Sequence, residues 1–147
     1  MEIFTKKCRI ERSLVRKNKK GKCSPYRNNY DGKDGGGDYY RGTCWYYKTL
    51  EKVEKKDTDV VYLEFEGVNS IAYIYFNDEL VGHHEGGFST FRCRVDNLLK
   101  EKNIIKVKVD NSANDRVYPQ WADFTFFGGI YRDVNLIVAN DTHFESI

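Results

Sequence analysis

Residues 61–83 read VYLEFEGVNSIAYIYFNDELVGH, and this stretch carries the pattern that decides the fold. Its first part alternates apolar with polar side chains, which is typical of a strand with one buried and one solvated face. Residues 70–76 are more continuously apolar and predict a second strand. Asn77 and Asp78 then supply two residues that tolerate positive φ, so we expect a tight hairpin to residues 79–83.

Similar patterns extend on both sides of this hairpin. Alternating or short apolar runs predict further strands, and a short helical turn is expected at 96–100. No run has the period of an amphipathic helix. About seven or eight short strands at this spacing predict an all-β fold, an antiparallel β-sandwich or jelly roll. The additional strands are expected at 44–50, 88–95, 105–109 and 131–138.

The chain of 147 residues has the length of one domain. Residues 1–24 form a basic leader, which we interpret as solvated and partly disordered; contact with phosphate is the alternative. Residues 25–43 are rich in Gly, Asn, Asp and Tyr, which is loop chemistry. We therefore expect a jelly-roll domain at 25–147 with its core at 44–138.

Charge and composition exclude several classes of partner. The net charge of +2 gives no strong field toward nucleic acid or an acidic membrane, and neither is expected as a partner. No segment approaches the roughly 20 apolar residues of a membrane helix, and residues 1–8 contain no secretory apolar region. The four cysteines match no zinc pattern. These features predict a cytoplasmic protein with reduced thiols.

Two short constellations invite a catalytic interpretation, and a structural one is favoured for both. Glu64 and Glu66 lie two positions apart on one strand, as a glycosidase pair might, but on the polar face where acids are ordinarily solvated. His83 and His84 are neighbours that would point to opposite faces of a strand, so they cannot bind one metal together. Loop packing is the expected role of the histidines.

The loop at 111–129, NSANDRVYPQWADFTFFGG, is the best candidate for a site. Long loops in compact domains tend to be functional, and a sugar site needs ring faces for stacking beside polar groups for hydroxyls. Its candidate substrate-binding residues are Arg116, Tyr118, Trp121 and Asp123. We expect most of the aromatic residues of the loop to plug one end of the sandwich, with Asp123 as the exception.

Five short motifs follow one another within 44–138. They are Trp45-Tyr46-Tyr47-Lys48, Phe65-Glu66-Gly67-Val68, Asn77-Asp78-Glu79-Leu80-Val81-Gly82, Glu85-Gly86-Gly87-Phe88-Ser89-Thr90-Phe91 and Gly129-Ile130-Tyr131-Arg132-Asp133-Val134. Together, and in this order, they resemble the N-terminal domain of family 2 glycoside hydrolases, the β-galactosidases in particular. The hairpin motif departs from the family pattern, because Asp78 stands where the family usually has Gly.

This resemblance implies a galactose-binding-like jelly roll packed against a catalytic (β/α)8 barrel. The acid and nucleophile glutamates of the family belong to the barrel, so the chain alone should be inactive. The resemblance places Asp123 near a β-galactoside substrate and an alkali cation of the full enzyme. No cofactor is expected in this chain, and Na or Mg is expected only in a full-length enzyme. The family's Pro-His-Asp segment has no counterpart near Pro25.

Three functions follow from these observations. The first is a non-catalytic domain that supports a barrel, as a separate domain or subunit, and helps to shape its substrate pocket. The second is a free-standing carbohydrate-binding module, which would need aromatic side chains exposed on a face or loop tip. The third is an interaction domain that complements a larger subunit. Sugar affinity of the lone chain would favour the second function over the others.

Overall fold

The computed structural model describes residues 4–6, 41–118 and 128–143, and strands dominate this part of the chain. One 3₁₀ turn, η1 at Asp96–Leu98, confirms the helical turn expected there. The strands are β1 (Phe4–Lys6), β2 (Thr43–Glu51), β3 (Asp59–Phe65), β4 (Val68–Asn69), β5 (Ile71–Phe76), β6 (Glu79–Glu85), β7 (Phe91–Arg94), β8 (Lys102–Asp110), β9 (Gly129–Ile130) and β10 (Val134–Asn140).

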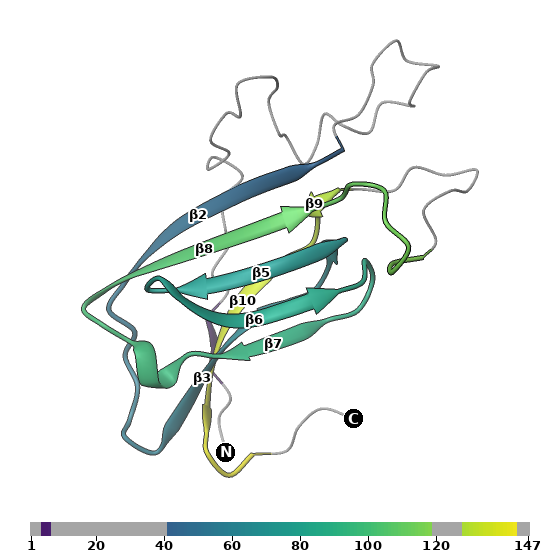
Figure 1. Ribbon diagram of the computed structural model, residues 1–147. Helices are drawn as coiled ribbons and strands as arrows, with labels where there is room; N and C mark the ends of the chain where they lie inside the picture. Colours follow the sequence, from purple (N-terminus) through teal and green to yellow (C-terminus); the bar gives the residue numbers. More distant parts are fainter. Residues whose placement is uncertain (1–3, 7–40, 119–127, 144–147) are drawn as a thin grey trace.

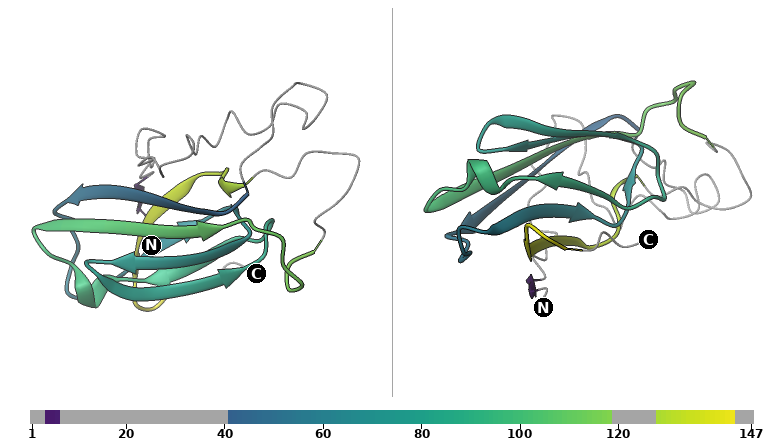
Figure 2. Two further views of the ribbon diagram at one scale, coloured as in Figure 1. Left: turned by 45° about the horizontal axis from the view of Figure 1, so that its top comes forward. Right: turned by 90° about the horizontal axis from the view of Figure 1, so that it is seen from below.

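The strands form two four-stranded sheets that face each other (Figures 1 and 2). Sheet A has the order β1-β10-β3-β7, and sheet B has the order β2-β8-β5-β6. A short third pairing joins β4 to β9. All pairs are antiparallel, which confirms the predicted antiparallel β-sandwich.

The alternation in the sequence becomes the division between core and surface. On β3 the residues Val61, Leu63 and Phe65 are fully buried, whereas Glu64 on the same strand is only half-buried on the other face. Burial of an apolar side chain of this size contributes about 1.5–3 kcal/mol. The core therefore lies between the inner faces of the two sheets. Sheet B contributes Cys44, Tyr46, Ala72, Ile74, Phe76, Ile105, Val107 and Val109 to it.

Two predicted strands are shorter than the sequence suggested. The strand expected at 88–95 is β7, Phe91–Arg94, because its partner β3 ends at Phe65, opposite Phe91. The strand expected at 131–138 begins only at Val134 and runs to Asn140. Residues 131–133 lie outside any strand and connect it to β9, Gly129–Ile130, which pairs with β4.

The hairpin at Asn77 and Asp78 is confirmed. Both residues have positive φ, 50° and 73°, as a type I′ turn requires. Asn77 also ties the turn to the neighbouring chain: its amide donates to the Leu98 carbonyl at 2.7 Å and to Asn103 Oδ1 at 2.9 Å, and its Oδ1 accepts from Ile104 N at 2.9 Å. The Asn77 side chain therefore stabilises the turn in addition to the positive φ of its backbone.

Replacing Asn77 with glycine should lower the free energy of unfolding by about 1–3 kcal/mol, although glycine accepts positive φ readily. The reason is that Asn103 is fully buried and loses one of its hydrogen-bond partners, while Ile104 N loses its acceptor. Urea unfolding measures the change. Asp78→Gly is the matched control, because among the described residues the Asp78 side chain, which is 74% exposed, makes only an ion pair with Lys106, and we expect a change within about 0.5 kcal/mol. Equal effects of the two substitutions would contradict this role of Asn77.

Parts of the predicted leader and the cysteines have separate outcomes. Phe4–Lys6 forms β1 and pairs with β10, while the rest of residues 1–24 lies outside the described residues, so the domain boundary stays a prediction.

Cys44 is disulfide-bonded, so the expectation of four reduced thiols is wrong at this position. Cys93 is free and buried, and burial raises its pKa to about 11. In the described part of the chain, no helix is long and apolar enough to span a membrane.

Candidate functional site

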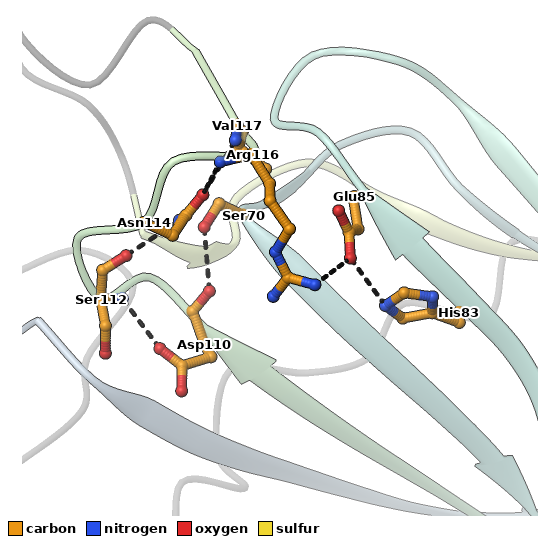
Figure 3. A network of polar contacts seen from close by, with 8 residues as sticks. All are labelled: Ser70, His83, Glu85, Asp110, Ser112, Asn114, Arg116 and Val117. Atoms are coloured by element: carbon orange, nitrogen blue, oxygen red, sulfur yellow. Dashed lines mark hydrogen bonds and ion pairs between the residues drawn. The ribbon is translucent and has the colours of Figure 1, made fainter.

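A polar network occupies one end of the sandwich, where β5 begins and where β6 and β8 end (Figure 3). The antiparallel register brings these strand ends together, since Ile71 pairs with both Glu85 and Asp110. The segment after β8 then passes along this edge through Ser112, Asn114 and Arg116 to Val117. This is the first half of the loop in which the sequence predicted a site.

Asp110 anchors the network at the end of β8. Its carboxylate accepts a hydrogen bond from Thr43 Oγ1 at 2.6 Å and another from Ser112 N at 2.8 Å. Its carbonyl accepts from Ser70 Oγ at 3.0 Å. Burial raises the pKa of Asp110, but these bonds to Ser112 and Thr43 outweigh it and hold the pKa below its ordinary value. The carboxylate is therefore ionised and acts as a fixed part of the scaffold.

Asn114 shapes the segment that follows. Its Oδ1 accepts hydrogen bonds from Arg116 N at 3.0 Å and Val117 N at 2.8 Å, and its amide donates to the Ser112 carbonyl at 3.0 Å. An Asn side chain that bonds its own backbone in this way replaces a strand ladder with a defined turn. Val117 is buried beside it. The loop thus has a fixed start, from which the side chain of Arg116 extends.

Arg116 reaches across the sheet edge to the last residue of β6 (Figure 3). Its Nη1 lies 2.8 Å from Glu85 Oε1, and His83 Nε2 lies 3.4 Å from the same oxygen. The Arg116 side chain is 54% exposed and the Glu85 side chain 29%. A guanidinium held by one carboxylate keeps donors that can bind hydroxyls or a second carboxylate. The pair is therefore suited to hydrogen bonding with a polar ligand.

The four predicted site residues have different outcomes. Arg116 belongs to the polar network, and Tyr118 follows it with its side chain 73% exposed. Trp121 and Asp123 lie outside the described residues, so their roles, including the alkali-cation site at Asp123, stay predictions. Within the described ranges, no group of three or more His, Cys, Asp or Glu side chains could hold a metal ion.

Glu64 and Glu66 are held by structural contacts. The Asn135 amide donates to both carboxylates at 3.1 Å, which puts the two accepting oxygens within about 6 Å of each other. Arg92 Nε also donates to Glu64 at 2.8 Å. Both lie toward the end of β3 on the face of sheet A opposite the core, and these contacts give the pair a structural role.

The two histidines point to opposite faces of a strand, as expected, and His84 Nε2 also contacts Ser89 Oγ of the 86–90 loop at 3.2 Å. His83 and His84 lie within β6 and stack against aromatic side chains. His83 stacks on Tyr73 with ring centroids 4.5 Å apart, and His84 stacks on Phe91 at 4.1 Å. Burial, with a smaller contribution from the charge of His83, lowers the pKa of His84.

Sequence reasoning did not assign Glu85 to the site, although its motif was recognised. Glu85 and Arg116 are 31 positions apart, and only the pairing of β5 with both β6 and β8 brings them together. The available signal was Glu85 itself, an acidic residue directly before Gly86 and Gly87. A charge at the end of a strand, before a glycine turn, can face a neighbouring loop.

Comparison with known families identifies a related domain type. The model of the family described as "Glycosyl hydrolase 2 galactose-binding domain-like" matches residues 15–123. Among curated relatives, a β-galactosidase of Thermoanaerobacter pseudethanolicus is 37% identical over an alignment of 113 residues that covers 74% of this chain. A β-glucuronidase of Bacteroides fragilis is 38% identical over an alignment of 107 residues that covers 71% of this chain. The matched region is 15% of the length of each relative.

Solved structures agree with this assignment. A Bacteroides uniformis β-glucuronidase matches with a TM-score of 0.64 and 38% identity, over 70% of this chain and 12% of that structure. A calcium-binding mutant of Bacteroides uniformis β-glucuronidase 2 matches with a TM-score of 0.77 and 28% identity, over 98% of this chain and 19% of that structure. The similarity therefore covers both the sequence and the arrangement of the strands.

Proposed function

The chain belongs to the glycosyl hydrolase 2 galactose-binding domain-like family, a non-catalytic domain of family 2 glycoside hydrolases. We propose that the end of the sandwich that carries the polar network around Arg116 and Glu85 helps to form a substrate pocket. The observation that carries the proposal is the Arg116–Glu85 pair. It combines an exposed guanidinium, a backbone fixed by Asn114 and an adjacent exposed ring at Tyr118. Such a combination suits recognition of a sugar by hydrogen bonds and ring contact.

The substrate and the partner are also proposals. The relatives are named as β-galactosidases and β-glucuronidases, which supports a β-galactoside or a β-glucuronide as the substrate of the whole enzyme. Arg116 could donate to the hydroxyls of either sugar, and to the carboxylate of a glucuronide. The partner would be a catalytic barrel, on the same chain or on a separate subunit. An alkali cation beside Asp123, and any Na or Mg ion, would belong to that complete enzyme.

The location in the cell stays a prediction. The sequence favoured the cytoplasm, but Cys44 is disulfide-bonded, and disulfides are rare in cytosolic proteins. Fractionation of the cells that make the protein would decide between these indications.

The chain alone should hydrolyse neither p-nitrophenyl β-galactoside nor p-nitrophenyl β-glucuronide above the buffer rate.

In the complete enzyme, Arg116→Gln should raise KM for the better of these two substrates about tenfold, which corresponds to the loss of a charge-assisted hydrogen bond worth about 1.4 kcal/mol. Steady-state kinetics measures the change.

Arg94→Gln is the matched control. The Arg94 side chain is 52% exposed and pairs with Asp96 at 2.7 Å, on sheet A, so it resembles Arg116 in exposure and pairing but not in position. We expect its KM to stay within twofold of the parent value. If Arg116→Gln leaves both KM and kcat at the values of the Arg94→Gln control, Arg116 does not reach the substrate. Turnover by the chain alone would contradict the non-catalytic assignment.

A further inference from the structure

The outer face of sheet B carries two rows of aromatic and basic side chains. The strand register defines them, because residues that pair across strands lie side by side on one face. We name the two rows together the aromatic–lysine face. The first row is Trp45 on β2, Lys108 on β8, Tyr73 on β5 and His83 on β6, and the second row is Tyr47, Lys106, Tyr75 and Leu80 on the same strands.

The rings of this face lie at shallow angles to one another. Trp45 and Tyr47 have centroids 6.3 Å apart and planes inclined by 25°, and Trp45 and Tyr75 have values of 6.0 Å and 32°. Tyr73 and His83 stack at 4.5 Å and 25°. Since the core takes the alternate residues of these strands, such as Tyr46 and Ile74, the aromatic–lysine face is directed away from it. The rings thus form a half-buried platform that spans the sheet.

Each row has a lysine at its centre. Lys108 lies between Trp45 and Tyr73, and its Nζ is 5.4 Å from the Tyr73 ring centroid, a cation–π contact. Among the described residues, Lys108 forms no ion pair within 4 Å. Lys106 pairs with Asp78, whose side chain is 74% exposed, and such pairs contribute little. The centre of the platform therefore presents positive charge between ring faces.

This combination favours one class of ligand. Ring faces suit the apolar C–H face of a pyranose, and ammonium groups suit carboxylates. The central lysines argue against a dry contact with another protein domain, because lysine is depleted in the buried centres of protein interfaces. We propose that the aromatic–lysine face binds a carbohydrate chain that carries carboxylate groups. This face adjoins the polar network of Arg116 and Glu85 at His83, whose Nε2 lies 3.4 Å from Glu85, but its rings and lysines belong to the middle of sheet B.

Isothermal titration of the 147-residue chain with three probes tests the proposal. They are an oligogalacturonate of seven residues, maltoheptaose as the uncharged sugar, and polyglutamate of similar charge as the anion without sugar rings. We expect the oligogalacturonate to bind at least tenfold more tightly than either control probe, with an affinity that falls as salt rises. Absence of oligogalacturonate binding would overturn the proposal and favour a contact with another protein. Equal binding of polyglutamate would overturn it too, because the face would then bind anions without recognising sugar rings.

Variants locate the binding on this face. Trp45→Ala should weaken oligogalacturonate binding at least tenfold, and Lys108→Gln, which removes the charge and keeps a polar side chain, about fivefold. Tyr62→Ala is the matched control, because Tyr62 is a half-buried aromatic on β3 of sheet A and contacts His143 rather than this face. The thermal midpoint of each variant verifies that it is folded. If Lys108→Gln and Trp45→Ala both bind as the Tyr62→Ala control does, the proposal fails, whatever the kinetics of Arg116 variants show.

Discussion

Replacing Phe65 with alanine is expected to lower the free energy of unfolding by about 3–5 kcal/mol. Phe65 is fully buried on β3, where it pairs with Val134 of β10 and Phe91 of β7. Its ring stacks on the Phe91 ring with centroids 5.0 Å apart and planes inclined by 9°. Removal of the ring leaves a cavity between the two sheets, because the neighbouring strands are held in register and cannot close the space.

Urea unfolding followed by circular dichroism measures this loss. Phe88→Ala is the matched control, since Phe88 is 56% exposed, and its change should stay near 0.5 kcal/mol. Phe65→Leu refills part of the space and should cost about half as much as Phe65→Ala, which keeps the test informative if the alanine variant does not fold. A loss below 1 kcal/mol in Phe65→Ala would contradict the central position of this side chain.

The elements that the sequence predicted correctly depend on local pattern. The period of two in Val61, Leu63 and Phe65 specified which face is buried, and the structure confirms it. The hairpin at Asn77 and Asp78 followed from the residues that accept positive φ. Both signals act over a few neighbouring positions, and therefore they can be recognised before any strand order is known.

The features that the sequence did not predict depend on strand register. Arg116 and Glu85 meet only because β5 pairs with β6 on one side and β8 on the other. The same register places Lys108 between Trp45 and Tyr73, although the alternation of β2 alone was visible from the sequence. A shift by one residue would send every side chain of a strand to the opposite face. Spacing along the chain therefore cannot specify which outward residues become neighbours.

Buried polar residues are a second kind of feature that pattern does not reveal. Asn103 is fully buried and bonds the backbone of Lys100 in both directions, with each distance 2.8 Å. Asn135 is buried between Glu64 and Glu66. Amides of this kind are common in solvated loops, and only the surrounding contacts show that they are enclosed. The period of two places Asn135 on the outer face, where a solvated amide is expected, whereas Asn103 continues the inward row of Ile105, Val107 and Val109 with a polar side chain.

The second large effect is expected from Gly129→Ala, with a loss of about 2–4 kcal/mol. Gly129 has φ +81, a conformation that costs an alanine about 1–2 kcal/mol. A methyl group there would also overlap the hydroxyl of Tyr46, which accepts a hydrogen bond from Ile130 N at 3.3 Å. Burial raises the pKa of this hydroxyl despite that bond, so the group is enclosed and has little room to move. Overpacking of such a site costs about 1–3 kcal/mol.

A double-mutant cycle separates the two contributions in Gly129→Ala. Tyr46→Phe removes the hydroxyl that the new methyl group would overlap, so in the Gly129→Ala background it should restore about 1–2 kcal/mol of stability. In the parent chain the same change should cost about 1 kcal/mol, because Ile130 N loses its acceptor. The strain from positive φ remains in both backgrounds, so the rescue should be partial. Strictly additive effects of the two substitutions in urea unfolding would show that Tyr46 and Gly129 are not in contact. The end of the loop at 111–129 would then be held to the sandwich by other contacts.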